Sequence, residues 1–146
     1  MKIDLYVMGK TKDFQTQKTA WARWQIVCVQ NNGTVESRNG VVCINNATTK
    51  RAVLCAIRDA LQRLKKPAVI KIYISDDYVR NALRNNWTRR WRDNGWHKIR
   101  YNQQLVHQDV WQQIESLMSS HAVSFAPPEE LNNKEMSQLE WRMNDG

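Results

Sequence analysis

The chain has 146 residues with 22 Lys and Arg against 14 Asp and Glu, which gives a formal net charge of +8 at pH 7. This length suits a single domain over residues 1–146 and excludes both a disulfide-stabilised mini-protein and a two-domain enzyme. A hydrophobic content of 42% argues against disorder, and the basic excess favours a polyanionic partner, most often nucleic acid.

Three strands are predicted in the first third of the chain, where apolar and polar residues alternate. Asn31-Asn32-Gly33 predicts a hairpin turn because Asn and Gly tolerate the positive φ that tight turns require. Asn39-Gly40 predicts a bulge in the third strand. The predicted strands are 2–9, 22–29 and 34–44, with a polar loop over 11–20.

The remainder of the chain alternates between helical and strand patterns. Thr48 or Thr49 can cap a helix of about four turns that ends before Pro67. The apolar run 68–74 predicts a central strand buried on both faces, and Ser75, Asp76 or Asp77 can cap the next helix. The later predicted elements are a helical stretch over 78–96, a loop over 97–107, a helix over 110–118, a short strand over 122–126 and a last helix over 129–143.

The cysteines and the ends of the chain limit the class of protein further. Cys28, Cys43 and Cys55 have no C-x-x-C spacing and lie among apolar neighbours, which predicts buried, reduced thiols and no metal site. No apolar run approaches the ~20 residues that a membrane helix needs. Charges close to Met1 leave no room for a secretory leader. We therefore expect a cytoplasmic protein without a membrane partner.

The most informative segment is 87–96, which is rich in Trp and Arg. Trp87 and Trp91 are four residues apart and therefore share one face of a helix. One interpretation is an aromatic stripe packed on the core with a solvated cationic face. The other is a projection that binds phosphates. The basic residues on the opposite face are Arg89, Arg90 and Arg92.

This segment resembles the basic protrusion of the bacterial type I ribonuclease H family (RNase HI), in which W-x-x-x-W-(K/R)-x-x-G-W contacts an RNA–DNA hybrid. Shorter similarities extend over nearly the whole chain. The matching positions are Trp87, Trp91, Arg92, Gly95 and Trp96 in the protrusion, Tyr78-Val79 before it, Asp109-Val110-Trp111 after it, and Thr48-Thr49-Lys50-Arg51-Ala52 at the first helix.

The resemblance implies an α/β ribonuclease H-like fold, which is a five-stranded mixed sheet with helices on both faces in the order βββαβαααβα. It also implies that the chain binds nucleic acid as an RNA–DNA hybrid or duplex RNA. The tryptophans are expected mainly to pack rather than to stack on bases. The expected binding residues are Arg84, Trp87, Arg89, Arg90, Trp91, Arg92, Trp96 and Lys98 of the protrusion, with Thr48, Thr49 and Lys50 at the first helix.

The family cleaves the RNA strand with two Mg²⁺ ions held by four carboxylates, and Mg²⁺ requires hard oxygen ligands. Local alignment places Met8, Ala52, Ser75 and Ser137 at the four acid positions. The loop His before the last helix is also missing from the aligned segment, Ala126-Pro127-Pro128. A thioether, a methyl group and two hydroxyls do not form a Mg²⁺ site. The domain is therefore predicted to be catalytically inactive and to need no cofactor.

Two alternatives stay open. Asp76 and Asp77 lie beside the third acid position and Glu135 lies near the fourth, so a residual Mg²⁺-dependent nuclease is one alternative. A one-residue shift on a strand turns a side chain to the other face, which favours helix capping by Asp76 or Asp77 over metal binding. The second alternative is a protein-interaction module on the same fold, because a fold does not fix a function.

The charge is unevenly distributed. Residues 1–100 carry 20 basic and 7 acidic side chains, net +13, whereas residues 101–146 carry 2 basic and 7 acidic, net −5. Acids at the four aligned positions would lower the total of +8 to about +4. About half of the basic excess is thus attributed to the missing acids, and the rest is concentrated around the Trp/Arg segment.

Overall fold

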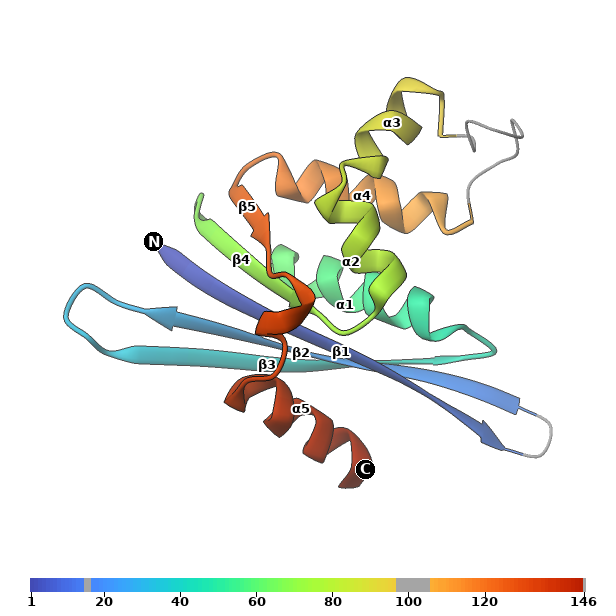
Figure 1. Ribbon diagram of the computed structural model, residues 1–146, viewed down its shortest axis with the longest axis horizontal. Coiled ribbons are helices and arrows are strands. Elements are labelled where there is room, and N and C mark those ends of the chain that lie inside the picture. The colour runs from blue at the N-terminus through green and yellow to red at the C-terminus, as the bar shows by residue number, and fades with distance from the viewer. Residues whose placement is uncertain (15–16, 97–105, 146) are drawn as a thin grey trace.

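The computed structural model describes the backbone of residues 1–14, 17–96 and 106–145 (Figure 1). Its elements follow the predicted order, with one short 3₁₀ helix added. The strands are β1 (Lys2–Phe14), β2 (Gln17–Val29), β3 (Val35–Asn45), β4 (Val69–Ile74) and β5 (Ala122–Phe125). The helices are α1 (Thr49–Gln62), α2 (Asp77–Arg84), α3 (Trp87–Asp93), α4 (Gln108–Met118), η1 (Pro128–Glu130) and α5 (Lys134–Asp145).

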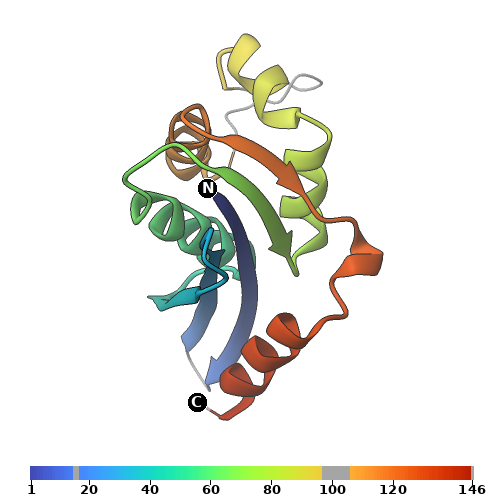
Figure 2. The same cartoon turned by 90° about the vertical axis from the view of Figure 1, so that its left-hand side faces the viewer.

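The five strands form one mixed sheet in the order β3-β2-β1-β4-β5. β1 pairs with β2 in antiparallel orientation and with β4 in parallel orientation. Side chains alternate across the sheet, so Leu5 and Val7 enter the large core with α1 while Tyr6 and Met8 face α5. Figure 2 shows α1 and α4 on one side of the sheet and α5 on the other. The predicted fold class is confirmed.

Several predicted boundaries were wrong in the sheet. The predicted loop over 11–20 contains the ends of two strands, because Thr11 pairs with Ala20 across the β1–β2 ladder. The predicted bulge is absent, since β3 stays in register with β2 through Asn39 and Gly40. Gly40 instead makes room for a large side chain, because a Cβ there would overlap the Trp24 ring.

The strand over 68–74 is not the central one. β1 occupies the middle of the sheet, and β4 lies between β1 and the edge strand β5. Ile70, Ile72 and Ile74 are fully buried, whereas Lys71 and Tyr73 on the other face are partly exposed. The apolar run predicted burial on both faces. It could not show that α5 covers only part of the second face.

Two predicted helical stretches are divided in the structure. The stretch over 78–96 is interrupted at Asn86, whose φ of 57° lies in the left-handed region that Asn tolerates better than most residues. The last helix begins at Lys134, because η1 and a short connection occupy 128–133. Among the described helices, none has the length and apolar character to cross a membrane.

The thiols differ from one another in exposure. Cys55 is buried in α1, as predicted, but Cys28 is partly exposed and Cys43 is exposed on the edge strand β3. The prediction of three buried thiols was therefore wrong for Cys43. Its neighbours Val42 and Ile44 pack against the core, so alternation along the strand places Cys43 on the opposite face of the edge strand.

Candidate functional site

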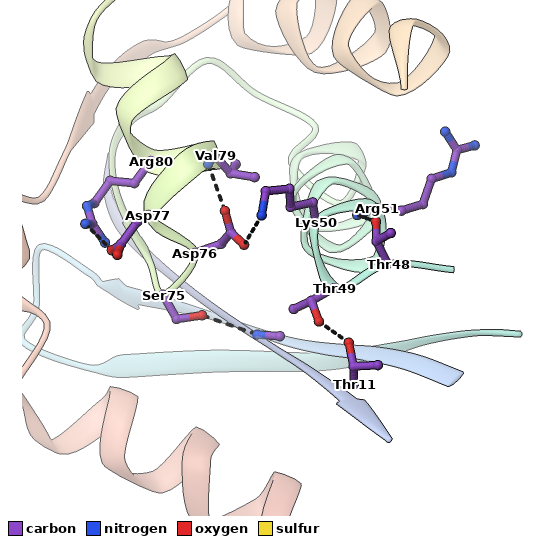
Figure 3. A network of polar contacts seen from close by, with 11 residues as sticks. Thr11, Thr48, Thr49, Lys50, Arg51, Ser75, Asp76, Asp77, Val79 and Arg80 are labelled. Carbon is purple, nitrogen blue, oxygen red and sulfur yellow. Dashed lines mark hydrogen bonds and ion pairs between the residues drawn. The ribbon is translucent and has the colours of Figure 1, made fainter. Parts of the chain in front are cut away.

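The candidate site lies where β1, β4 and the beginning of α1 meet. β4 pairs with β1 as far as Val7–Ile74, and the Ser75 N–H then donates to the Val7 carbonyl at 3.1 Å. The Gly9 N–H donates in turn to Ser75 Oγ at 3.3 Å (Figure 3). Met8 and Ser75, two of the aligned acid positions, are therefore neighbours at the end of the parallel ladder.

Gly9 allows α1 to approach β1 closely. A Cβ at Gly9 would overlap the side chains of Val53 and Thr49. The hydroxyls of Thr49 and Thr11 also form a hydrogen bond between α1 and β1. Ala52, the second of the four aligned acid positions, is fully buried in this part of α1. We call Met8, Gly9, Thr49, Ala52 and Ser75 the junction.

The fourth aligned position is not part of the junction's described contacts. Asn133 accepts the Met136 N–H at 2.9 Å and caps α5, so Ser137 lies in the first turn. Ser137 is exposed. α5 contacts the sheet through Met136 and Leu139, which cluster with Tyr6, and Met8 packs against the same cluster.

The two aspartates beside the junction have structural partners. Asp76 is the N-cap of α2, and its Oδ1 accepts the Val79 N–H at 2.9 Å. Its Oδ2 lies 3.8 Å from Lys50 Nζ. Asp77 binds the buried Arg80 at 2.5 Å, and Arg80 also donates to the Ile74 carbonyl at 3.1 Å. Helix capping was the interpretation favoured from the sequence, and the geometry confirms it for Asp76.

Lys50 and Arg51 leave the start of α1 in different directions (Figure 3). Thr48 caps α1 by accepting the Arg51 N–H at 3.2 Å. Lys50 reaches Asp76 and lies 5.6 Å from the centre of the Tyr78 ring. Arg51 instead binds both oxygens of Asp109 at 2.8 Å, which lowers the pKa of that carboxyl to about 2.

The tryptophans form a packed series in what we call the protrusion, residues 84–96. The ring centroids of Trp87 and Trp91 are 6.2 Å apart, and those of Trp91 and Trp111 are 5.1 Å apart, both edge to face. Trp91 is only 8% exposed, and Trp87 and Trp96 are partly buried against the core. Trp87, Trp91 and Trp96 therefore pack against the core, as expected.

The cations of the protrusion are not equivalent. Arg84, Arg89 and Arg90 are exposed. Arg92 is exposed as well, as predicted, but among the described residues it differs from these three in donating to Glu115 of α4 at 2.6 Å. The ion pair could not be inferred from the sequence, because 23 residues separate Arg92 from Glu115. Lys98 lies outside the described residues.

Glu115 belongs to an open groove of about 670 Å³ between α3 and α4 that the sequence did not predict. Burial raises the pKa of the Glu115 carboxyl, and Arg92 acts in the opposite direction. Arg89, Arg92 and Trp96 also line this groove. The groove therefore brings together two protrusion arginines and an acid from another helix.

The mixed sheet order and the α1–β1–β4 junction define a ribonuclease H-like fold. A family model described as RNase H matches residues 12–127, and the chain belongs to this family. It is 32% identical over 94 residues to a Ribonuclease H of Nitratidesulfovibrio vulgaris (strain DSM 19637 / Miyazaki F), which covers 64% of this chain and 58% of that protein. A Ribonuclease H of Symbiobacterium thermophilum is 36% identical over 80 residues, 55% of this chain and 54% of that protein. The matches thus span a little over half the length of these relatives.

Solved structures agree on the fold. LC9-RNase H1, described as a type 1 RNase H with the type 2 active-site motif, superposes with a TM-score of 0.80 at 13% identity, covering 97% of this chain and 69% of that one. The PFV RNase H domain gives 0.72 at 16% identity, with 98% and 90% covered. A foamy viral protease-reverse transcriptase solved in complex with RNA/DNA hybrid gives 0.72 at 17% identity, with 94% and 19% covered.

Proposed function

We propose that this RNase H-family domain binds nucleic acid, as an RNA–DNA hybrid or duplex RNA, and does not cleave it. The observation that carries the proposal is the composition of the junction. Of the three aligned acid positions there, Met8 offers a thioether, Ala52 a methyl group and Ser75 a single hydroxyl that already accepts the Gly9 N–H. A nuclease of this family needs carboxylates at these positions.

Magnesium, which the family implies, does not fit these residues. Mg²⁺ takes near-octahedral oxygen ligands and is held through carboxylates. Asp76, the acid that directly follows Ser75 in the sequence, caps α2 and pairs with Lys50. In the described part of the chain, no three His, Cys, Asp or Glu side chains are grouped so as to hold a metal ion.

Binding is attributed to phosphate contacts. Arg84, Arg89 and Arg90 present exposed guanidinium groups on the protrusion, and Lys50 adds an ammonium group at the start of α1. Such contacts depend strongly on salt and carry little sequence information. The relatives are ribonucleases H, and one structural neighbour was solved in complex with an RNA/DNA hybrid. A hybrid is therefore the first ligand to test.

The test combines binding and cleavage on the whole chain. Fluorescence anisotropy with labelled RNA–DNA hybrid, duplex RNA and duplex DNA at physiological salt should show binding to one of the first two. Gel analysis of the same hybrid in Mg²⁺ or Mn²⁺ should show no cleavage. Cleavage that EDTA abolishes would instead establish a residual nuclease.

Charge removal on the protrusion tests where binding occurs. Arg89→Ala/Arg90→Ala should weaken hybrid binding by about tenfold or more and reduce the salt slope by nearly two, because two phosphate contacts are lost. Lys65→Ala/Lys66→Ala is the matched control, since it removes two exposed charges that follow the C-terminal end of α1. Equal affinities for the two variants would exclude the protrusion as the binding element.

Absence of binding to all three nucleic acids would favour the alternative, a protein-interaction module. The edge strand β3 is the surface to test in that case. Val35 and Val41 on β3 are 61% and 55% exposed, and an edge strand offers unpaired backbone groups to a partner strand.

A further inference from the structure

A row of side chains crosses the sheet through the junction. On one side of Met8, the β1–β2 register places Arg23 directly opposite it. Val41 of β3 lies opposite Arg23 in turn, and Ser75 lies beside Met8 on the other side. Directly opposed residues of antiparallel strands project from the same face. Arg23 and Met8 therefore share the face of the sheet that carries α5.

Arg23 lies close to Met8 and Ser75, the two strand positions aligned with metal-binding acids of the family. Neighbouring strands are about 4.8 Å apart, so Met8 is one strand spacing from Arg23 and Ser75 about two. A long, flexible arginine side chain spans such distances. The guanidinium can therefore reach an anion held over Met8 or Ser75.

The guanidinium of Arg23 differs from the other cations around the junction. Lys50 pairs with Asp76, Arg51 with Asp109, and Arg80 with Asp77. Arg23 takes part in none of the ion pairs found within the described part of the chain.

Burial makes the unpaired state of Arg23 costly. The side chain is partly buried, and its Nε atom is buried without a hydrogen-bond partner among the described residues. A partly buried charge without a partner is unfavourable. Arginine is also the side chain best shaped to bind phosphate through two parallel hydrogen bonds.

We propose that Arg23 binds a backbone phosphate of the nucleic acid over Met8, supplying from a side chain the positive charge that metal ions supply in the active members of the family. The proposal rests on the proposed function, since it assumes a bound nucleic acid. It predicts that binding needs no divalent cation. It also assigns a second binding position on the sheet, separate from the protrusion.

The test measures hybrid affinity by fluorescence anisotropy in EDTA at several salt concentrations. Arg23→Ala should weaken binding about tenfold, the loss expected for a charge-assisted contact, and reduce the salt slope by about one. Arg23→Lys keeps the charge but lacks the planar guanidinium group, so its hybrid affinity should lie between those of Arg23→Ala and the wild type. Wild-type binding should persist in EDTA, and millimolar Mg²⁺ should not strengthen it.

Arg38→Ala is the matched control. Arg38 lies on the neighbouring strand β3 opposite Ile26, whose side chain enters the core with α1, so it projects from the other face. This variant removes one exposed charge and should bind the hybrid within about twofold of the wild type. Circular dichroism must show that each variant is folded; if Arg23→Ala is not, Arg23→Lys decides the result.

The outcomes separate the two proposals. If the wild type binds no nucleic acid, both the proposed function and this inference fail. A second outcome is that the wild type binds, that Arg89→Ala/Arg90→Ala weakens binding, and that the Arg23 variants bind as well as Arg38→Ala. In that case only the role of Arg23 is overturned. A requirement of wild-type binding for Mg²⁺ would overturn it as well.

Discussion

Arg51 binds both carboxylate oxygens of Asp109 at 2.8 Å and thereby joins the N-terminal ends of α1 and α4. His107 lies beside this pair, with its Nδ1 3.5 Å from Arg51 Nη1. Burial and the Arg51 charge both lower the pKa of the His107 side chain. The pair fixes the end of α1 that carries Thr48, Thr49 and Lys50.

Asp109→Asn should lower the free energy of unfolding by about 1 kcal/mol at pH 7. The shift of the Asp109 pKa to about 2 exaggerates this contribution, because the side chain is 65% exposed and solvent screens the pair. Urea denaturation measures the change. Asp59→Asn is the control, because the ion pair of Asp59 within the described residues is with its neighbour Arg58, at 3.4 Å. An equal loss in both variants would contradict the prediction.

The same pair should make stability depend on pH. The folded-state pKa of Asp109 lies below the unfolded value of about 3.9, so the stabilisation is fully present above about pH 4 and is lost as the pH falls toward 2. The difference in stability between the wild type and Asp109→Asn should therefore shrink over this window. A difference that stays constant from pH 5 to pH 2 would exclude the ion pair as its cause.

Gly9→Ala should destabilise the protein by about 1–3 kcal/mol, the usual cost of overpacking. The added Cβ would overlap the side chains of Val53 and Thr49 where α1 meets β1. Thermal and urea unfolding measure the loss. In a double-mutant cycle, Val53→Ala should relieve part of it, so the double variant should lose less than the sum of the two single variants; strict additivity would argue against the overlap.

Millimolar Mg²⁺ should leave the melting temperature of the wild type unchanged, because the junction has no carboxylate set to bind it. A variant with acids at the aligned positions, Met8→Asp/Ala52→Glu/Ser75→Asp/Ser137→Asp, should melt lower in EDTA, since clustered carboxylates repel and Ala52 is fully buried. Mg²⁺ should then raise its melting temperature by several degrees.

The control for the acid variant is its uncharged counterpart, Met8→Asn/Ala52→Gln/Ser75→Asn/Ser137→Asn, which has nearly the same shape and should not respond to Mg²⁺. Differential scanning fluorimetry with and without the ion measures all three proteins. A rise of several degrees in the wild type itself would show that the chain retains a metal site.

Trp91→Ala should cost about 3–5 kcal/mol of stability, as for other large buried aromatic residues. Trp91 is buried and contacts both Trp87 and Trp111 edge to face. Trp87→Ala is the matched comparison and should cost less, because Trp87 is only partly buried. Chemical denaturation gives both values; a small loss at Trp91 together with a large loss of hybrid affinity would instead indicate base stacking.

Local sequence signals were sufficient to predict the order of helices and strands and the helix caps beside the junction. Thr48 and Asp76 cap helices because their side-chain oxygens can accept a backbone N–H three residues ahead, which is a short-range property. The Trp87–Trp91 spacing likewise predicted a shared helix face. The alignment that places Met8, Ala52 and Ser75 at the family's acid positions also uses only short sequence motifs.

Only the tertiary structure decided which of these residues lie together. The opposition of Met8 and Arg23 depends on the β1–β2 register, and a shift of one residue would turn either side chain to the other face. The pairing of Arg92 with Glu115 and the exposure of Cys43 depend on elements distant in sequence. Sequence periodicity records which face of an element is apolar, whereas strand register and helix packing determine which polar groups meet there.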